Sequence, residues 1–222
     1  MINRSDLKHH FLTTSHDIKG LFDKTNKLSS FMYKLEKQAQ KDPDRYKPND
    51  YVGDGFEFLM EIFIKAHAFT YQIGITDYEP IKSNDDNGID GTGINISGEK
   101  CVIQHKYRSN SQSFLTANKD HLSNMFSAAD TTYGIDSIVS EKSTLTKMFE
   151  AKMFSQSKYE KRLKELEKQA PRHYVFTTAK DLHHFTDNEM YKNQVKCIGY
   201  DDLRIMLEDN VSFWNLCRKL VK

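Results

Sequence analysis

The chain has few residues that crosslink or stiffen a protein, and it has no excess of charge of either sign. Its 222 residues include three cysteines, four prolines and one tryptophan. Cys101, Cys197 and Cys217 are far apart and form no paired motif, which indicates reduced thiols rather than a disulfide framework. The 32 basic and 31 acidic side chains give a formal net charge of +1. This balance excludes a polycation that coats nucleic acid without selectivity, so any such site must be a local patch.

Long apolar runs are also missing. No stretch approaches the roughly 18 apolar residues of a membrane span, and the first residues lack the basic-then-apolar pattern of a secretory signal. We therefore expect no membrane contact and a cytoplasmic, intracellular location. A phosphate-binding loop of the Gly-Lys-Ser/Thr type is absent, and Gly91-Thr92-Gly93 lacks the third glycine of a dinucleotide fingerprint. The chain is therefore not expected to be an ATPase by itself.

The apolar spacing predicts an N-terminal extension followed by one main domain. Apolar residues at intervals of three and four predict an amphipathic helix over Ser15–Gln40, and the prolines and charges of Lys41–Asp50 predict a linker. The same spacing predicts a helix over Asp54–His67. We accordingly predict a helical extension over residues 1–49 and a main domain over residues 50–222.

The remaining elements predict an α/β architecture. Two short apolar runs, 88–96 and 100–107, predict a β-hairpin that turns at residues 97–99. A long, charged, solvated helix is expected over 141–169, within a helical insertion at about 130–172. The other expected elements are helices over 118–129, 181–191, 201–207 and 211–220, and parallel strands over 174–177 and 195–198.

Two polar residues interrupt the apolar strand of the predicted hairpin. Gln104 and Lys106 alternate with apolar neighbours, so both side chains should lie on one face of the sheet. If residues 97–99 form the turn, Asp90 lies opposite Lys106 and Thr92 lies opposite Gln104. The alternative interpretations are an ordinary turn aspartate at Asp90 and an exposed edge strand carrying Gln104 and Lys106.

A further acidic residue, Glu57, has no cationic neighbour along its predicted helix. Asp54, Glu57 and Glu61 form one stripe, and such like charges are destabilising unless a cation compensates them. Glu61 has Lys65 four residues on, whereas a metal ion could supply the charge that Glu57 lacks. The alternative interpretation is a capping box, with Asp54 at the N-cap and Glu57 three residues later.

Together these side chains suit metal-dependent hydrolysis of a phosphodiester. Carboxylate oxygens of Asp90 and Glu57 and the amide oxygen of Gln104 suit Mg²⁺, a hard ion that binds few protein carboxylates and keeps several waters. Lys106 could orient the attacking water and stabilise charge on the phosphate. A calcium loop counted from Asp86 fails, because Ser97 stands where the bidentate glutamate belongs. Zinc-type spacing is missing around His105 and around His183 and His184.

The sequence resembles the restriction-endonuclease-like nucleases of the PD-(D/E)xK superfamily, in particular the Mrr-like branch with a Gln-x-Lys variant. Residues 53–108 carry the matching motifs, and residues 174–207 match loosely: Gly53-Asp54-Gly55-Phe56-Glu57, Gly88-Ile89-Asp90-Gly91, Gln104-His105-Lys106-Tyr107, Val175-Phe176-Thr177-Thr178 and Cys197-Ile198-Gly199. The resemblance implies a mixed β-sheet flanked by helices and a Mg²⁺-dependent DNA endonuclease, with Mn²⁺ able to substitute. It implies Asp90, Gln104 and Lys106 as the catalytic trio and Glu57 as the helix-borne carboxylate.

DNA is the partner that this resemblance implies, and several questions stay open. Arg108, Lys119 and Tyr107 follow the catalytic strand and are candidate DNA contacts. Double-strand cleavage needs two active sites, which favours a homodimer with the 15–40 helix as candidate interface. The branch's winged-helix reader is missing here, which favours a motor or DNA-recognition partner. The alternatives are a structure-specific nuclease such as a junction resolvase, and a DNA-binding subunit that needs a partner for turnover.

Overall fold

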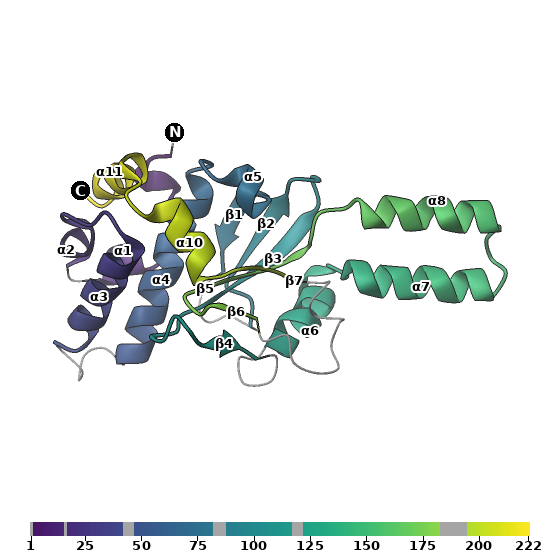
Figure 1. The fold of residues 1–222 in the computed structure, drawn as a ribbon, viewed down its shortest axis with the longest axis horizontal. Coiled ribbons are helices and arrows are strands. Elements are labelled where there is room, and N and C mark those ends of the chain that lie inside the picture. The colour runs from purple at the N-terminus through teal and green to yellow at the C-terminus, as the bar shows by residue number, and fades with distance from the viewer. Residues whose placement is uncertain (1, 16, 42–46, 82–87, 117–121, 183–194) are drawn as a thin grey trace.

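The computed structural model shows a mixed β-sheet with helices on both faces (Figure 1). It describes residues 2–15, 17–41, 47–81, 88–116, 122–182 and 195–222. Successive side chains of the central strands enter different cores: Ile103 and Tyr174 pack with the N-terminal and C-terminal helices, whereas Val102 and Val175 pack with α6 (Leu122–Tyr133). This alternation follows from the period of two in a strand. The predicted α/β class is confirmed at this level.

The main sheet has five strands in the order β1-β2-β3-β5-β7. β1, β2 and β3 are antiparallel, whereas β3, β5 and β7 are parallel. The predicted hairpin and the predicted parallel strands are therefore confirmed, and β3 is an interior strand. The edge strand β1 was not predicted. The bounds are β1 (Ile75–Pro80), β2 (Gly91–Asn95), β3 (Lys100–Lys106), β5 (His173–Thr177) and β7 (Val195–Ile198).

A second, two-stranded parallel sheet pairs β4 (Phe114–Leu115) with β6 (Asp181–Leu182). The prediction of a helix that begins at Asp181 is wrong for these first two residues, because their backbone pairs with β4. The remainder of that predicted helix, from residue 183, lies outside the described residues.

The N-terminal segment contains short helices rather than one long one. The predicted helix over residues 15–40 is wrong as a single element, because α2 (Ile18–Phe22) and α3 (Leu28–Ala39) are separated. Lys24 adopts a left-handed conformation with φ 53°, and the Thr25 hydroxyl donates to the Leu21 carbonyl. Both features end α2, because a left-handed residue cannot continue a right-handed helix. A 3₁₀ turn (Arg4–Asp6) and α1 (Phe11–Thr14) precede these helices.

The central helix α4 (Pro48–Lys65) begins six residues before the predicted start. Pro48 occupies its first turn, where a missing N–H costs nothing. Asp54 therefore lies inside the helix and cannot be its N-cap, so the capping-box interpretation of Asp54 and Glu57 is wrong. A short helix, α5 (Thr70–Ile73), follows and leads into β1.

Two antiparallel helices, α7 (Ile138–Glu150) and α8 (Gln156–Glu167), project from the body of the protein (Figure 1). The prediction of one long helix over residues 141–169 is wrong. Lys152 has a positive φ of 59°, which reverses the chain, and the Ser155 hydroxyl caps α8 by accepting from the Lys158 N–H. The Phe149 and Tyr159 rings stack at 4.5 Å between the two helices. We call these two helices and the return to the sheet, residues 138–172, the arm.

The C-terminal helices α10 (Tyr200–Leu207) and α11 (Val211–Leu220) confirm the last two predicted helices. α11 packs against the N-terminal segment, where Phe31 and Trp214 lie with ring centroids 6.3 Å apart. The buried apolar side chains of the 15–40 segment, our candidate dimer interface, therefore pack against α4 and α11 of the same chain. None of the helices formed by the described residues combines the length and apolarity that crossing a membrane requires.

Candidate functional site

The predicted site residues come from the end of β3, from the turn before β2 and from α4. The observed hairpin pairs Ile94 with Lys100, so its register differs by two residues from the predicted pairing of Ile96 with Lys100. The turn is longer because the buried Asn95 amide oxygen accepts the backbone N–H groups of Ser97 and Glu99, both at 3.0 Å. A shift of two residues leaves the side-chain faces unchanged. It does place Asp90 beside Gln104 and His105 instead of Lys106.

The Asp90 carboxylate is held at the end of the β2–β3 ladder. The Asp90 backbone N–H donates to the Ile103 carbonyl at 3.0 Å, and its Oδ2 accepts the His105 N–H at 2.5 Å. The side chain therefore takes the place of a backbone acceptor, and only 8% of it is exposed. This geometry fixes the carboxylate and agrees poorly with an ordinary exposed turn aspartate.

Gln104 is fully buried, and only the nitrogen of its side-chain amide has a hydrogen-bond partner among the described residues. Its Nε2 donates to the Gly88 carbonyl at 2.8 Å, which orients the amide. Its Oε1 has no hydrogen-bond partner among the described residues. A buried acceptor without a partner costs about 1–3 kcal/mol and calls for an explanation, for which a bound cation is one physical candidate. The burial also excludes the exposed-edge interpretation of this strand.

Lys106 is the last residue of β3 and is partly exposed. Its carbonyl accepts from the Thr177 hydroxyl at 2.6 Å and from the Thr178 N–H at 3.3 Å, so β5 fixes its backbone. The next residues are also held: the Tyr107 hydroxyl donates to Glu36 at 2.5 Å, and the Arg108 guanidinium donates to the Tyr107 carbonyl. The third candidate DNA contact, Lys119, lies outside the described residues.

Glu57 has a partner that the local sequence did not reveal. His9 Nε2 lies 3.1 Å from Glu57 Oε2, and His10 Nε2 lies 2.9 Å from Asp54 Oδ2. Glu61 accepts the backbone N–H groups of Lys8 and His9 besides its Lys65 ion pair. The N-terminal segment thus donates hydrogen bonds to the acidic stripe of α4. Glu57 has a hydrogen-bond partner 48 residues earlier in the sequence, but burial lowers the pKa of the His9 imidazole, so this partner supplies no positive charge at pH 7.

Glu57 and Asp90 act on the same buried phenol. Tyr78 is 1% exposed, and burial raises its pKa, with further increases from the charges of Asp90 and then Glu57. Burial lowers the pKa of His9, and the negative charge of Asp90 opposes this shift by a smaller amount. The fold therefore brings the helix-borne carboxylate and the hairpin carboxylate to one region. The sequence analysis had grouped these two carboxylates only because both belong to motifs of the family that the chain resembles.

His105 points to the α4 side of the sheet, opposite to Val102 and its α6 core. Phe56, Tyr78 and Phe176 surround its ring, with centroids 6.4, 5.8 and 5.8 Å away. Neither ring nitrogen has a hydrogen-bond partner among the described residues, and Nδ1 lies 3.8 Å from the Asp90 carboxylate. Burial lowers the His105 pKa to about 3, so the ring is neutral at pH 7.

A groove of about 490 Å³ begins where β3 ends. Tyr107, Arg108 and Ser109 form one wall, and the ends of α3 and α4 form the other. Its size suits a small ligand or part of a larger one. Gly53, one helical turn before Glu57, also lines the groove, whereas Glu57 and Asp90 are not among its lining residues.

The donors suit a hard cation. Within the described ranges, no group of three or more His, Cys, Asp and Glu side chains is placed to hold a metal. The predicted set consists of two carboxylates, Asp90 and Glu57, and the Gln104 amide oxygen. By the alternation of β3, Gln104 shares the α6 face with Val102, whereas Glu57 lies on α4, so the described contacts do not bring these two side chains together. Oxygen donors with few carboxylates fit Mg²⁺ or Mn²⁺ better than zinc.

Comparisons with protein-family models, with characterised proteins and with solved structures found no match for the chain. The site therefore stands on its own residues and contacts.

Proposed function

We propose that the chain is a metal-dependent DNA endonuclease of the restriction-endonuclease-like, Mrr-like type. The observation that carries the proposal is the end of β3. There the fixed Asp90 carboxylate accepts the His105 N–H, and Gln104, whose buried amide oxygen has no partner among the described residues, lies two residues before Lys106 on the strand. The mixed sheet flanked by helices agrees with the fold that the sequence resemblance implies.

In this proposal Asp90, Gln104 and Glu57 would hold Mg²⁺. When bound, the ion would lower the pKa of a coordinated water and would place positive charge beside the phosphate. The chain fixes the ligands in advance: the His105 N–H holds Asp90, the Gly88 carbonyl orients Gln104, and His9 holds Glu57. Such prior positioning reduces the reorganisation needed during the reaction.

Lys106 carries the remaining chemistry. Its ammonium group can orient a water for attack and offset the negative charge that grows on the phosphate oxygens. The β5 contacts to its backbone restrict where this side chain can reach. In this proposal the groove that follows, with Tyr107 and Arg108, would receive the DNA strand on one side of the scissile phosphate.

Cleavage by the purified chain tests the proposal. Plasmid, linear, single-stranded and branched DNA are incubated with Mg²⁺, with Mn²⁺ or with EDTA. We expect metal-dependent cleavage that Asp90→Ala and Lys106→Ala both reduce at least 100-fold. Asp130→Ala and Lys219→Ala, which replace exposed residues of the same types on α6 and α11, serve as matched controls and should cleave normally.

The substrate preference assigns the type of nuclease. Cleavage of duplex plasmid supports the restriction-type role, whereas a strong preference for branched DNA favours the junction-resolvase alternative. Cleavage that survives Asp90→Ala would refute the site. DNA binding without any cleavage would refute a self-sufficient enzyme and favour a subunit that depends on a partner.

A further inference from the structure

The arm carries a net positive charge, whereas the rest of the chain is net negative. Between Glu141 and Arg172 the sequence has nine Lys and Arg residues and five Glu, a net charge of +4. Because the whole chain carries +1, the remainder carries −3. The fold thus separates a basic projection from a mildly acidic body, although the overall composition is neutral.

Four of the arm's seven lysines lie on one side of α8. Lys158, Lys161, Lys164 and Lys168 recur at intervals of three and four, which places them along one side of a helix. All four are exposed. The apolar residues that face α7, among them Tyr159, lie on the opposite side. One acid, Glu165, lies on the basic side.

Most of the arm's cations have no ionic partner. Within the described ranges, only Lys142 and Arg172 among its nine basic residues form ion pairs, with Glu167 and with two glutamates respectively. The seven cations without an ion pair are Lys147, Lys152, Lys158, Lys161, Arg162, Lys164 and Lys168. An ordinary solvated helix usually alternates charges so that they compensate, whereas unpaired cations along one side match a line of phosphates.

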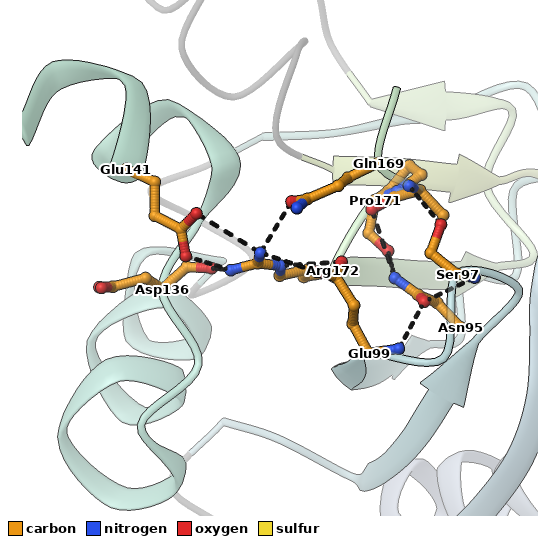
Figure 2. A network of polar contacts seen from close by, with 9 residues as sticks. Asn95, Ser97, Glu99, Asp136, Glu141, Gln169, Pro171 and Arg172 are labelled. Atoms are coloured by element: carbon orange, nitrogen blue, oxygen red, sulfur yellow. Dashed lines mark hydrogen bonds and ion pairs between the residues drawn. The ribbon is translucent and has the colours of Figure 1, made fainter. Parts of the chain in front are cut away.

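A network of hydrogen bonds and ion pairs joins the base of the arm to the sheet (Figure 2). The Arg172 guanidinium binds Glu99 of the β2–β3 turn at 3.1 Å and Glu141 of α7 at 2.6 Å, and it also reaches Gln169 at 2.8 Å. Asn95 adds bonds from its amide to the Ala170 and Pro171 carbonyls. These contacts fix the arm to the turn of the hairpin that carries Gln104 and Lys106.

We propose that the basic side of α8, defined by Lys158, Lys161, Lys164 and Lys168, binds the phosphate backbone of duplex DNA outside the cleavage site. This inference rests on the proposed function for its choice of DNA as the ligand. β3 spans about 20 Å from the arm's base to Lys106, and α8 adds about 18 Å. The two sites together could contact roughly 11 base pairs at 3.4 Å each.

The test replaces the four lysines together. Glutamine has a helix propensity close to that of lysine, so the Lys158→Gln, Lys161→Gln, Lys164→Gln, Lys168→Gln variant should keep α8 folded. The matched control replaces four exposed lysines of the body, Lys19, Lys24, Lys37 and Lys219, and changes the net charge equally. A third variant with arginine at the four arm positions retains the charge. Circular dichroism verifies that all three are folded.

Binding to a 24-base-pair duplex is measured by fluorescence anisotropy in EDTA from 50 to 200 mM salt. Four lost phosphate contacts should make the slope of log K against log salt less steep by about 3 to 4. We expect at least tenfold weaker binding at 100 mM salt for the glutamine variant, and near-native binding for the body control and the arginine variant.

Equal affinity and slope for the glutamine variant and the wild type would overturn the arm proposal, and so would a wild type that binds no duplex. An equal loss in the body control would also overturn it, because the effect would then be one of net charge alone. Since EDTA prevents cleavage, these outcomes are independent of the Asp90→Ala test. The nuclease proposal could therefore fail while the arm proposal stands, or the reverse.

Discussion

The buried histidine at the start of β5 predicts how the stability of the protein depends on pH. His173 is 1% exposed, and its ring lies 4.8 Å from the ring of Phe126. Burial lowers its pKa from 6.5 to about 4, and the positive charge of Arg172 acts in the same direction. The folded protein therefore keeps this ring neutral at pH values where the unfolded chain protonates it.

The sign and size of the effect follow by linkage. Between about pH 6.5 and pH 4 the unfolded state binds more protons, so the free energy of unfolding falls as the pH falls through this window. At pH 8 the contribution is absent. pH 5 lies 1.5 pH units below the ordinary histidine pKa of 6.5, and each unit corresponds to about 1.4 kcal/mol. At pH 5, His173 should therefore lower the free energy of unfolding by about 2 kcal/mol.

The measurement compares urea unfolding of the wild type and of His173→Leu at pH 8 and pH 5. The substitution has its own cost, but that cost cancels when each protein is compared with itself across pH. We expect the wild type to lose about 2 kcal/mol more than the variant between the two pH values. Equal losses would refute the claim that burial keeps this imidazole neutral, and an NMR titration of the ring would then show a pKa near 6.5.

Four further substitutions test the packing. Arg172→Met should lower the unfolding free energy by about 2 kcal/mol, because two partly exposed glutamates lose their partner; an unchanged urea midpoint would contradict this. A Cβ at Gly55 would lie 2.4 Å from Leu35 Cδ1, whereas one at Gly53 meets nothing within 4 Å. Gly55→Ala should therefore destabilise by about 1–3 kcal/mol, and Gly53→Ala should stabilise by about 0.5–1 kcal/mol, as thermal melting would show. Trp214→Phe removes a 2.7 Å bond from the indole N–H to a buried carbonyl and should cost about 2 kcal/mol, with unaltered melting as the contrary result.

The sequence alone was sufficient where local periodicity carries the information. Short apolar runs predicted β3, and the strand and helix patterns near the C-terminus predicted β5, β7, α10 and α11. β3 and β5 are buried on both faces and therefore appear as apolar runs, whereas the helices bury one stripe, so both patterns are visible without the fold. The identity of the candidate residues Asp90, Gln104, Lys106 and Glu57 also came from the sequence.

Only the tertiary structure decided the helix boundaries, the hairpin register and the partners of the site. Lys24 and Lys152 reverse the chain within runs that read as continuous helix, because surrounding contacts stabilise a left-handed residue there. Asn95 lengthens the hairpin turn through its own side chain. His9 approaches Glu57 only after the N-terminal segment has packed on α4. Each of these features depends on contacts between residues that are far apart in the sequence, or on single residues outside any repeating pattern. The spacing of apolar residues along the chain therefore cannot predict them.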